Sequence, residues 1–400
     1  MRRLASLAAP AVAVLVAACG AAVGPGSSNF SELSGSGTLQ MLNPQDGWTY
    51  SRDMVARTSD GARTFDVVTP PGVGGDGQVA DPFFLDAAHA WVWVIRWNQS
   101  VLASATLERT ADGGASWTVM PRQAVLEGGM TFVDLQHGWM ITGRESGNHT
   151  AVENTLWRTS DGGATWSQLI RVTHRISIEP KVQVGDCEWL GQIAWTSTIH
   201  GVAGVDCPFD APPAVEITDD GGSTWRQVSL PDLPPRDGIG LFEDVGDVHV
   251  FAGGGLAAFV SRCVGPDGNS CQPYGELYRS DDAGVTWTPG SVILRGGGLL
   301  MPDADHAWMP NSCLSEQCDS AQILVTADGG AHWQQLPLPQ ALWPNMHGSR
   351  SYSFVSSTVG FVVVSNEFQT GSSFYQTTDG GHTFVAFTPR FLPPKATRRV

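Results

Sequence analysis

Short apolar stretches separated by glycine-rich turns recur along most of the chain. Over no long stretch do the apolar positions follow the i, i+3, i+4, i+7 spacing of an amphipathic helix, so helix is expected to be scarce. The stretches are instead rich in β-branched and aromatic residues and are bounded by Gly, Asp and Pro, which is typical of short β-strands. The pattern therefore predicts an all-β protein.

One eight-residue motif, here called the octad, closes each recurrence. It reads Thr or Ser, any residue, Asp, two Gly positions, two further residues, and Trp or Phe. The seven copies are Thr58–Phe65, Thr110–Trp117, Thr159–Trp166, Thr218–Trp225, Ser280–Trp287, Thr326–Trp333 and Thr377–Phe384, with Asp60, Asp112, Asp161, Asp220, Asp282, Asp328 and Asp379 at the third position. Successive octad Asp residues are 46 to 62 residues apart. A repeat of this size indicates an array of similar structural units.

The chemistry of the octad predicts a tight hairpin turn. Its Asp carboxylate can accept hydrogen bonds from backbone N–H groups across the turn. The two Gly positions supply positive φ angles, and the closing aromatic ring begins the next strand and is buried. Ala62 and Ala283 replace Gly in the first and fifth copies, so these two turns are expected to be strained or differently shaped. The octad Asp residues are interpreted as structural.

A second element precedes each octad and reads as a strand, a short turn and another strand. Its copies end in Asp46–Trp48, His89–Trp91, His137–Trp139, His200–Val202, His249–Phe251, His306–Trp308 and Val359–Phe361. Together with the octad hairpin it gives four strands per unit. Seven such units predict a seven-bladed β-propeller of four-stranded antiparallel blades, because a closed ring leaves only short edges exposed.

The octads resemble the Asp-box, or BNR, repeat of sialidases, sortilin-like receptors and xyloglucanases. With the second element included, residues 39–388 resemble the photosystem II assembly factor family of seven-bladed (WD40/YVTN/BNR-like) propellers. The resemblance implies the fold and a role in handling another envelope or membrane protein. It says little about activity, because Asp boxes are structural turns in all of these families. The photosynthetic partner is not carried over to this chain.

The N-terminus has the features of an export signal. Arg2 and Arg3 precede the uncharged apolar run Leu4–Ala18, which is shorter than the about 20 residues that span a bilayer. Val16-Ala17-Ala18-Cys19 resembles a bacterial lipobox, which implies cleavage before Cys19 and a lipid on its thiol. A plain signal peptide or an uncleaved anchor is the alternative.

These features divide the chain into four parts. Residues 1–18 are the predicted signal peptide, and residues 19–38 are the lipidated Cys19 with a Gly/Ser-rich tether of low apolar content. Residues 39–388 form the propeller, and residues 389–400 a C-terminal tail. The expected location is the cell membrane, lipid-anchored on the extracytoplasmic side.

Six cysteines follow Cys19, and an even number in an exported chain favours disulfides. Cys187 lies before the first strand of the fourth unit and Cys207 after its second strand, so antiparallel pairing brings them together. Each of the other two pairs lies within one loop between a second and a third strand. The repeat therefore favours, among the possible pairings, Cys187–Cys207, Cys263–Cys271 and Cys313–Cys318.

Alternating strand direction divides the predicted ring into two faces. The octads and the first turns of each unit share one face, here called the turn face. The loops between second and third strands and those between units share the other, here called the loop face. Length variation and the predicted disulfides fall on the loop face, and variable loops on a rigid scaffold usually carry binding.

Candidate binding residues were sought among the large and charged side chains of the loop face. Exposed Trp and Arg are enriched at protein interfaces, so Trp189 beside Cys187 is the foremost candidate. For each residue the alternative is a solvated loop position or packing beneath a loop. The candidates are Trp97, Arg144, Glu145, His149, Glu188, Trp189, Arg262, Tyr274, Trp343, His347 and Arg350.

Charge and composition restrict the partners. The chain has 23 Lys and Arg against 39 Asp and Glu, a net charge of −16, so nucleic acid is not an expected partner. An acidic body is also repelled by anionic headgroups, which leaves membrane contact to the lipid. We expect a monomer that binds a protein or glycan partner of the cell envelope.

The search for catalytic and metal sites found no established pattern. Five His residues, at positions 89, 137, 200, 249 and 306, are spread one per unit and are interpreted as turn residues. No HExxH motif, Cys/His zinc spacing or nucleophile elbow is present. A sialidase needs a Tyr nucleophile, a Glu and an Arg cluster, which the sequence does not display. We therefore expect no metal, no cofactor and no enzyme activity. The alternative is a sialidase-like or xyloglucanase-like glycoside hydrolase with an atypical site.

Overall fold

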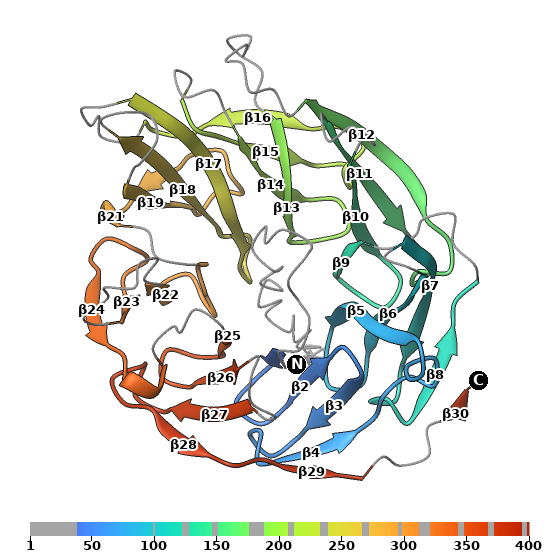
Figure 1. The fold of residues 1–400 in the computed structure, drawn as a ribbon. Coiled ribbons are helices and arrows are strands. Elements are labelled where there is room, and N and C mark those ends of the chain that lie inside the picture. The colour runs from blue at the N-terminus through green and yellow to red at the C-terminus, as the bar shows by residue number, and fades with distance from the viewer. Residues whose placement is uncertain are drawn as a thin grey trace, which may run out of the picture.

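The computed structural model shows seven blades of β-strands arranged radially around a central axis (Figure 1), and the pairing of Asp206 with Asp244 joins the fourth and fifth blades in one sheet. The fold is a seven-bladed β-propeller of four-stranded blades, which confirms the prediction. The described part of the chain contains one short 3-10 helix, Gln340–Leu342, and no helix long and apolar enough to cross a membrane. The residues described are 38–98, 101–121, 128–145, 151–175, 188–206, 212–232, 239–265, 272–294, 298–311, 321–342, 348–366, 372–393 and 398–399.

Each blade runs outward from its first strand, which lies nearest the axis (Figure 1). Blades 1 to 3 consist of β1 (Thr38–Met41), β2 (Gly47–Ser51), β3 (Met54–Thr58) and β4 (Thr64–Val67); β5 (Gly77–Phe84), β6 (Ala90–Asn98), β7 (Val101–Thr110) and β8 (Ser116–Val119); and β9 (Gly129–Phe132), β10 (Gly138–Glu145), β11 (Ala151–Thr159) and β12 (Ser167–Arg175). Blade 4 consists of β13 (Glu188–Trp195), β14 (Gly201–Asp206), β15 (Ala214–Thr218) and β16 (Arg226–Ser229).

The remaining blades follow the same order with local variations. Blade 5 consists of β17 (Ile239–Val250), β18 (Leu256–Gly265), β19 (Gln272–Ser280) and the short β20 (Thr288–Pro289) and β21 (Ile293–Leu294). In blade 6 the innermost position is an isolated bridge of Leu300 to Trp308, followed by β22 (Ala307–Asn311), β23 (Gln322–Thr326) and β24 (Gln334–Pro337). Blade 7 consists of β25 (Gly348–Phe354), β26 (Gly360–Asn366), β27 (Ser372–Thr377) and β28 (Val385–Phe387).

Stacked aromatic rings join neighbouring blades. The Trp near the start of a second strand lies against the ring that ends or nearly ends the first strand of the next blade. The indole N–H of Trp139 also donates to the Gly221 carbonyl of the next blade at 2.9 Å. Because these rings are flat and fully buried, each interface gains a large apolar contact with defined geometry. The stacked pairs and centroid separations are Trp48–Phe84 (5.0 Å), Trp91–Phe132 (3.9 Å), Trp139–Trp195 (3.6 Å) and Trp308–Phe354 (4.2 Å).

The ring closes between blades 1 and 7, each with its own strands. The backbone N–H groups of Leu39 and Met41 donate to the hydroxyls of Ser351 (3.2 Å) and Ser353 (2.9 Å) in blade 7. The chain then continues past blade 7 along the outside of the ring (Figure 1). There β29 (Arg390–Leu392) pairs in parallel with β4, and β30 (Arg398–Arg399) pairs in parallel with β8. The segment predicted as a C-terminal tail thus adds outer strands to the first two blades.

Blade 5 differs from its sequence-based alignment. The prediction placed His249–Phe251 at the first turn, but His249 and Val250 lie inside β17. The turn that follows is made by Gly253 and Gly254, whose φ angles are 92° and 90°. A pair of glycines with positive φ turns the chain without the Asp and His found at this turn in blades 2, 3 and 6. The prediction for His249 is therefore wrong.

Candidate functional site

On the turn face, the octad carboxylates are committed to their own turns. In blade 3, Asp161 Oδ1 accepts hydrogen bonds from Thr159 Oγ1 and the Thr165 N–H, both at 2.8 Å. Its Oδ2 accepts from Thr165 Oγ1 at 2.6 Å. The other octads repeat this arrangement, with His332 taking the hydroxyl position beside Asp328 in blade 6. In blade 4 the hydrogen bonds from the Thr224 hydroxyl and backbone N–H lower the pKa of Asp220 to about 2.

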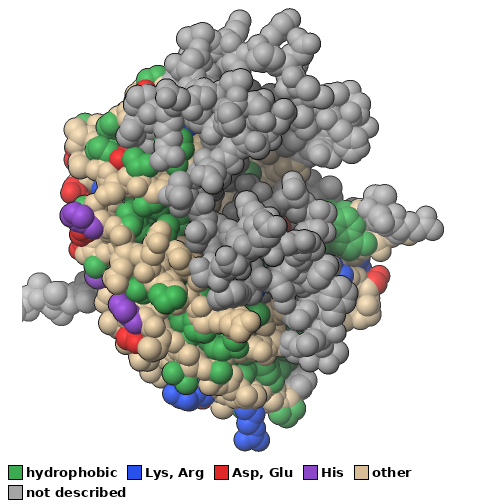
Figure 2. Space-filling model, turned by 60° about the vertical axis from the view of Figure 1, so that its left-hand side comes forward, with side chains coloured by type: hydrophobic (Ala, Val, Ile, Leu, Met, Phe, Trp, Pro, Cys, Tyr) green, Lys and Arg blue, Asp and Glu red, His purple; other side chains and the backbone are tan. Residues whose placement is uncertain are grey.

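The first turns of the blades lie against the octads. The N–H of the first octad Gly donates to a carbonyl of this turn, as from Gly113 to Ala88 at 2.8 Å and from Gly162 to Gln136 at 2.9 Å. These contacts place both elements on one face, as the strand alternation predicted. Three turn histidines contact the Asp three residues earlier, each with a shortest separation of 2.8 Å: His89–Asp86, His137–Asp134 and His306–Asp303. Figure 2 shows His side chains beside acidic ones along one edge of the ring.

Arginines connect the octads of successive blades. Arg57, Arg109, Arg158 and Arg279 each precede the first octad residue of their own blade. A Cβ atom built on the first Gly of the next octad would lie 2.0 to 2.6 Å from a guanidinium nitrogen, at Gly113, Gly162, Gly221 and Gly329. Blade 4 has Ile217 at the Arg position, and the next octad carries Ala283, whose φ is 57°. Ala62 likewise has a positive φ of 63°, so both alanine turns are strained, as the sequence predicted.

The octad carboxylates of the turn face are thus hydrogen-bonded within their own turns. Among the described residues, no group of three or more His, Cys, Asp or Glu is arranged to hold a metal ion. The turn-face histidines occupy separate blades and contact separate carboxylates, so they form no shared centre. What the turn face does chemically is to hold turns together.

On the loop face, several predicted residues lie outside the described part of the chain. These are His149, Trp343 and His347, together with Cys19, Cys187, Cys207, Cys271, Cys313 and Cys318. For others only the backbone is described: Arg144 and Glu145 end β10, Glu188 and Trp189 begin β13, and Cys263 lies in β18. The placement of Cys263 in a loop was wrong, because β18 continues to Gly265.

Trp97 is the one exposed large aromatic among the predicted residues whose side chains are described. It lies near the end of β6, where the register with β7 shifts between Arg96 and Trp97, and it is 45% exposed. Beside it, Arg96 Nε lies 3.2 Å from Asp76 Oδ1, and Arg96 Nη2 donates to the Gly72 carbonyl at 2.9 Å. These contacts of Arg96 with Asp76 and Gly72 fix the backbone beside Trp97, whose indole is partly exposed to solvent.

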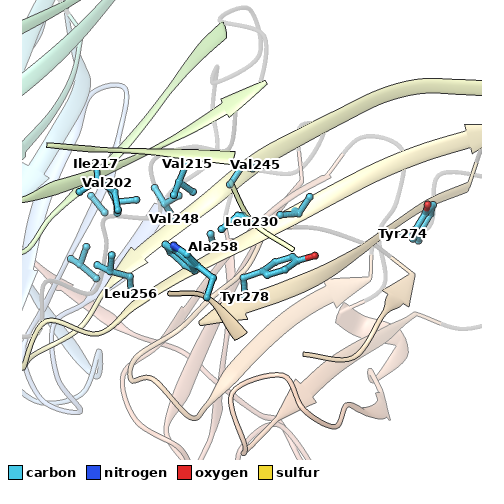
Figure 3. Close-up of a cluster of buried hydrophobic side chains, with 14 residues drawn as sticks. Val202, Val215, Ile217, Leu230, Val245, Val248, Leu256, Ala258, Tyr274 and Tyr278 are labelled. Atoms are coloured by element: carbon cyan, nitrogen blue, oxygen red, sulfur yellow. The ribbon is translucent and has the colours of Figure 1, made fainter. Parts of the chain in front are cut away.

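Two predicted loop residues are in fact buried within strands. Arg262 in β18 is 7% exposed and forms an ion pair with Asp232 at 3.0 Å. Tyr274 in β19 is 1% exposed and belongs to the apolar cluster between blades 4 and 5 (Figure 3). In the same cluster, the hydroxyl of Tyr278 donates to the Pro231 carbonyl at 2.7 Å. The strands of blade 5 extend further than the sequence indicated, which places both side chains inside the blade.

Arg350 lies in β25, the innermost strand of blade 7, and is half-buried. Burial lowers the pKa of its guanidinium, and burial raises the pKa of the neighbouring Tyr352 to about 12. Both groups therefore belong to the wall of the ring and not to a loop.

Sequence reasoning missed an acidic residue on the inner wall. Asp81 lies in β5, the innermost strand of blade 2, where the register with β6 shifts between Ala80 and Phe83. Its φ is 38°, a left-handed conformation that is uncommon for any residue other than Gly. Burial raises the pKa of Asp81. The signal in the sequence was an Asp-Pro pair inside a strand pattern, because Pro within a strand marks a bulge or an edge.

Comparison with known proteins finds similarity at the level of structure only. No family model and no curated protein matches the sequence. Among solved structures, the PL25 ulvan lyase bound to a sulfated disaccharide repeat has a TM-score of 0.50 at 11% identity, covering 78% of this chain and 85% of that one. YCF48 bound to a D1 peptide has a TM-score of 0.48 at 14% identity, covering 85% and 91%. The GH74 xyloglucanase from Xanthomonas campestris has a TM-score of 0.35 at 11% identity, covering 88% and 80%.

The strand order places the chain in the class of β-propellers, and the comparison corrects one expectation. We expected no enzyme activity, but the similar structure with a TM-score of 0.50 is a polysaccharide lyase. The ulvan lyase likeness shows that the same ring can carry catalysis. The absence of a familiar motif in the sequence was therefore not a sufficient reason to exclude an enzyme.

Proposed function

We propose that this chain is an extracytoplasmic, lipid-anchored Asp-box propeller that binds a protein or glycan partner of the cell envelope through its loop face. The observation that carries the proposal is the contrast between the two faces. The turn face uses its polar groups internally, whereas Trp97 on the loop face is 45% exposed at the end of a long hairpin. A rigid aromatic side chain exposed on a fixed strand is the kind of residue that anchors an interface.

The anchor part of the proposal rests on the lipobox-like Val16–Cys19 and on the Gly/Ser-rich segment after it. Replacing Cys19 by Ser removes the thiol that would carry the lipid. We expect radiolabelled palmitate to enter the wild-type protein and not Cys19→Ser, and Cys19→Ser to leave the membrane fraction. Equal labelling of both proteins would contradict the anchor.

The proposal includes the three disulfides expected from the sequence, and strand register supports one of them, Cys187–Cys207. Glu188 and Asp206, the neighbours of Cys187 and Cys207, are register partners in β13 and β14. Antiparallel partners have closely spaced Cβ atoms, which suits a disulfide at the adjoining positions. Peptide mapping without reduction is expected to recover Cys187–Cys207, Cys263–Cys271 and Cys313–Cys318 as linked pairs.

The binding role is tested by partner capture with two matched variants of the full-length protein. Trp97→Ala removes the exposed indole of the loop face. Leu135→Ala removes a side chain that is also 45% exposed but lies on the turn face. After crosslinking in intact cells, one specific partner is expected with wild type and Leu135→Ala and at least ten-fold less of it with Trp97→Ala. Trp189→Ala is expected to lose the same partner. Equal recovery by all variants would reject the loop face as the binding surface.

A further inference from the structure

Asp81 differs from the octad Asp residues in the hydrogen bonding of its carboxylate. The octad carboxylates accept hydrogen bonds from the hydroxyls and backbone N–H groups of their own turns, as at Asp112 and Ser116. Within the described part of the chain, no residue donates a hydrogen bond to the carboxylate of Asp81. The octad carboxylates are thus hydrogen-bonded within their turns, whereas that of Asp81 has no hydrogen-bond donor among the described residues.

The backbone at Asp81 is strained as well. With φ at 38°, an L-residue places its Cβ close to the following carbonyl, which Gly avoids. The register shift between Ala80 and Phe83 is a β-bulge, a device that re-aims side chains and is common beside functional sites. Strain of this kind persists only where the surrounding structure imposes it, and it concentrates at ligand sites. A Gly at this position would relieve it.

The polar neighbours of Asp81 come from blade 1. Tyr50 in β2 lies beside β5, with its ring 6.1 Å from that of Phe84, three residues after Asp81. Burial is the main cause that raises the pKa of Tyr50, and the negative charge of Asp81 raises it further. Tyr50 in β2 is also hydrogen-bonded to the side chain of Thr38, its register partner in β1. Blade 2 is tied here to blade 1 by the Val79 N–H, which donates to the Arg52 carbonyl at 2.7 Å. Thr38, Tyr50 and Asp81 are all half-buried, so they remain partly accessible.

We propose that Asp81 and Tyr50 form a binding subsite for the hydroxyl groups of an uncharged glycan, on the inner wall of the ring between blades 1 and 2. The inference rests on the proposed binding role and gives it a ligand class. A carboxyl accepts hydrogen bonds in either protonation state, and a phenol both donates and accepts them, which matches the paired donor and acceptor character of sugar hydroxyls. The ring of Tyr50, 6.1 Å from that of Phe84, adds an apolar surface for the face of a sugar.

The chemistry of the subsite also selects against other small ligands. Burial favours the protonated form of the Asp81 carboxyl, so the subsite offers a cation little charge. An anionic sugar would meet the same carboxyl, which on ionisation repels it. Each hydroxyl of a neutral sugar can donate a hydrogen bond to the carboxyl whichever form the carboxyl takes.

The experiment separates a ligand-binding Asp81 from a structural one. Full-length protein in detergent is titrated with neutral hexasaccharides of glucose, mannose, galactose or arabinose, and its thermal midpoint is recorded. Asp81→Gly is expected to weaken glycan binding at least ten-fold while raising the thermal midpoint by about 1–2 °C, because the backbone strain is relieved. Asp81→Asn, which tolerates the same φ and keeps hydrogen-bonding groups, is expected to bind within about three-fold of wild type. Tyr50→Phe is expected to weaken binding.

Asp112→Gly is the matched control on the turn face, where it should lower the thermal midpoint and leave glycan binding unchanged. A lower thermal midpoint for Asp81→Gly would show that its carboxyl serves the fold and would overturn the proposal. Failure of wild type to bind any of the hexasaccharides would also overturn it. That second result leaves partner capture through Trp97 untouched, so the two proposals fail separately.

Discussion

The turn face and the inner wall use the same acidic residue in opposite ways. At Asp161, hydroxyl and backbone donors surround a carboxylate that closes a hairpin, and the arrangement recurs in every blade. At Asp81, one blade breaks its strand with a bulge and a positive φ, and no described residue pairs with the carboxylate. The octad Asp residues recur because the hairpin turns require them. Asp81 strains the backbone without closing a turn, so its presence needs a reason other than folding.

The same contrast separates two groups of tryptophans. Trp139 is 1% exposed and stacks on Trp195 with ring centroids 3.6 Å apart, whereas Trp97 is 45% exposed. The first holds two blades together, and the second leaves nearly half of its surface in contact with solvent. Their chemistry is identical, so their position in the blade decides whether they serve stability or recognition.

The largest expected effect tests this division. Trp139→Ala removes a stacked ring from a blade interface and should lower the free energy of unfolding by about 3–5 kcal/mol. Trp97→Ala removes a ring that is only partly buried and should lower it by a smaller amount, about 1–2 kcal/mol. Urea unfolding followed by circular dichroism measures both. A loss of several kcal/mol from Trp97→Ala would mean that the loop-face indole is part of the core.

A smaller expected effect is on the pH dependence of stability, where His249 and the turn-face carboxylates act in different pH ranges. Burial lowers the pKa of His249 to about 4, from an ordinary value of about 6.5. A depressed pKa gives stability that is fully present above pH 6.5 and is lost as the pH falls toward 4, because the unfolded chain binds the proton first. Octad carboxylates with a pKa of about 2, such as Asp379, lose their contribution only below about pH 4.

His249→Leu is therefore expected to flatten the pH dependence of stability between pH 6.5 and 4, by about 3 kcal/mol at most. The fall below pH 4 should remain. Leu135→Ala, at an exposed side chain that carries no titratable group, is the control and should leave the upper window unchanged. Urea midpoints at pH 7.5, 5.5 and 4.5 decide the matter. An unaltered slope in His249→Leu would show that His249 is not the titrating group.

The smallest expected effect concerns the alanine turn of blade 5. Ala283→Gly removes a non-Gly residue with φ of 57° and should stabilise the protein by about 1 kcal/mol. Gly113→Ala is the reverse change in a turn where Arg57 Nη1 would lie 2.0 Å from the new Cβ, so it should destabilise. Differential scanning calorimetry compares the two. Stabilisation by Gly113→Ala would refute the role assigned to the arginine contact.

What the sequence could predict here is set by the range of the interactions involved. The sequence predicted the number of blades, the octad turns and the two strained alanines. These features depend on contacts within about eight residues, such as that of Thr159 with Asp161, and their repetition made them recognisable. Blade 5 was misaligned because Gly253 and Gly254 form its turn without the usual Asp and His. Tyr274 and Arg262 were assigned to loops, but they lie in paired segments of β19 and β18. The length of these strands depends on how far they pair with each other, and local composition does not encode that length.

By itself the sequence determined that this protein is a ring of seven similar units, because each unit carries its own turn chemistry and its own apolar strands. Only the tertiary structure decided which side chains the ring encloses and which it leaves open. Tyr50 meets Phe84 across a blade boundary, and β29 pairs with β4 more than 300 residues away in the chain. Contacts between residues so far apart in sequence depend on the closed ring, since no local pattern specifies them.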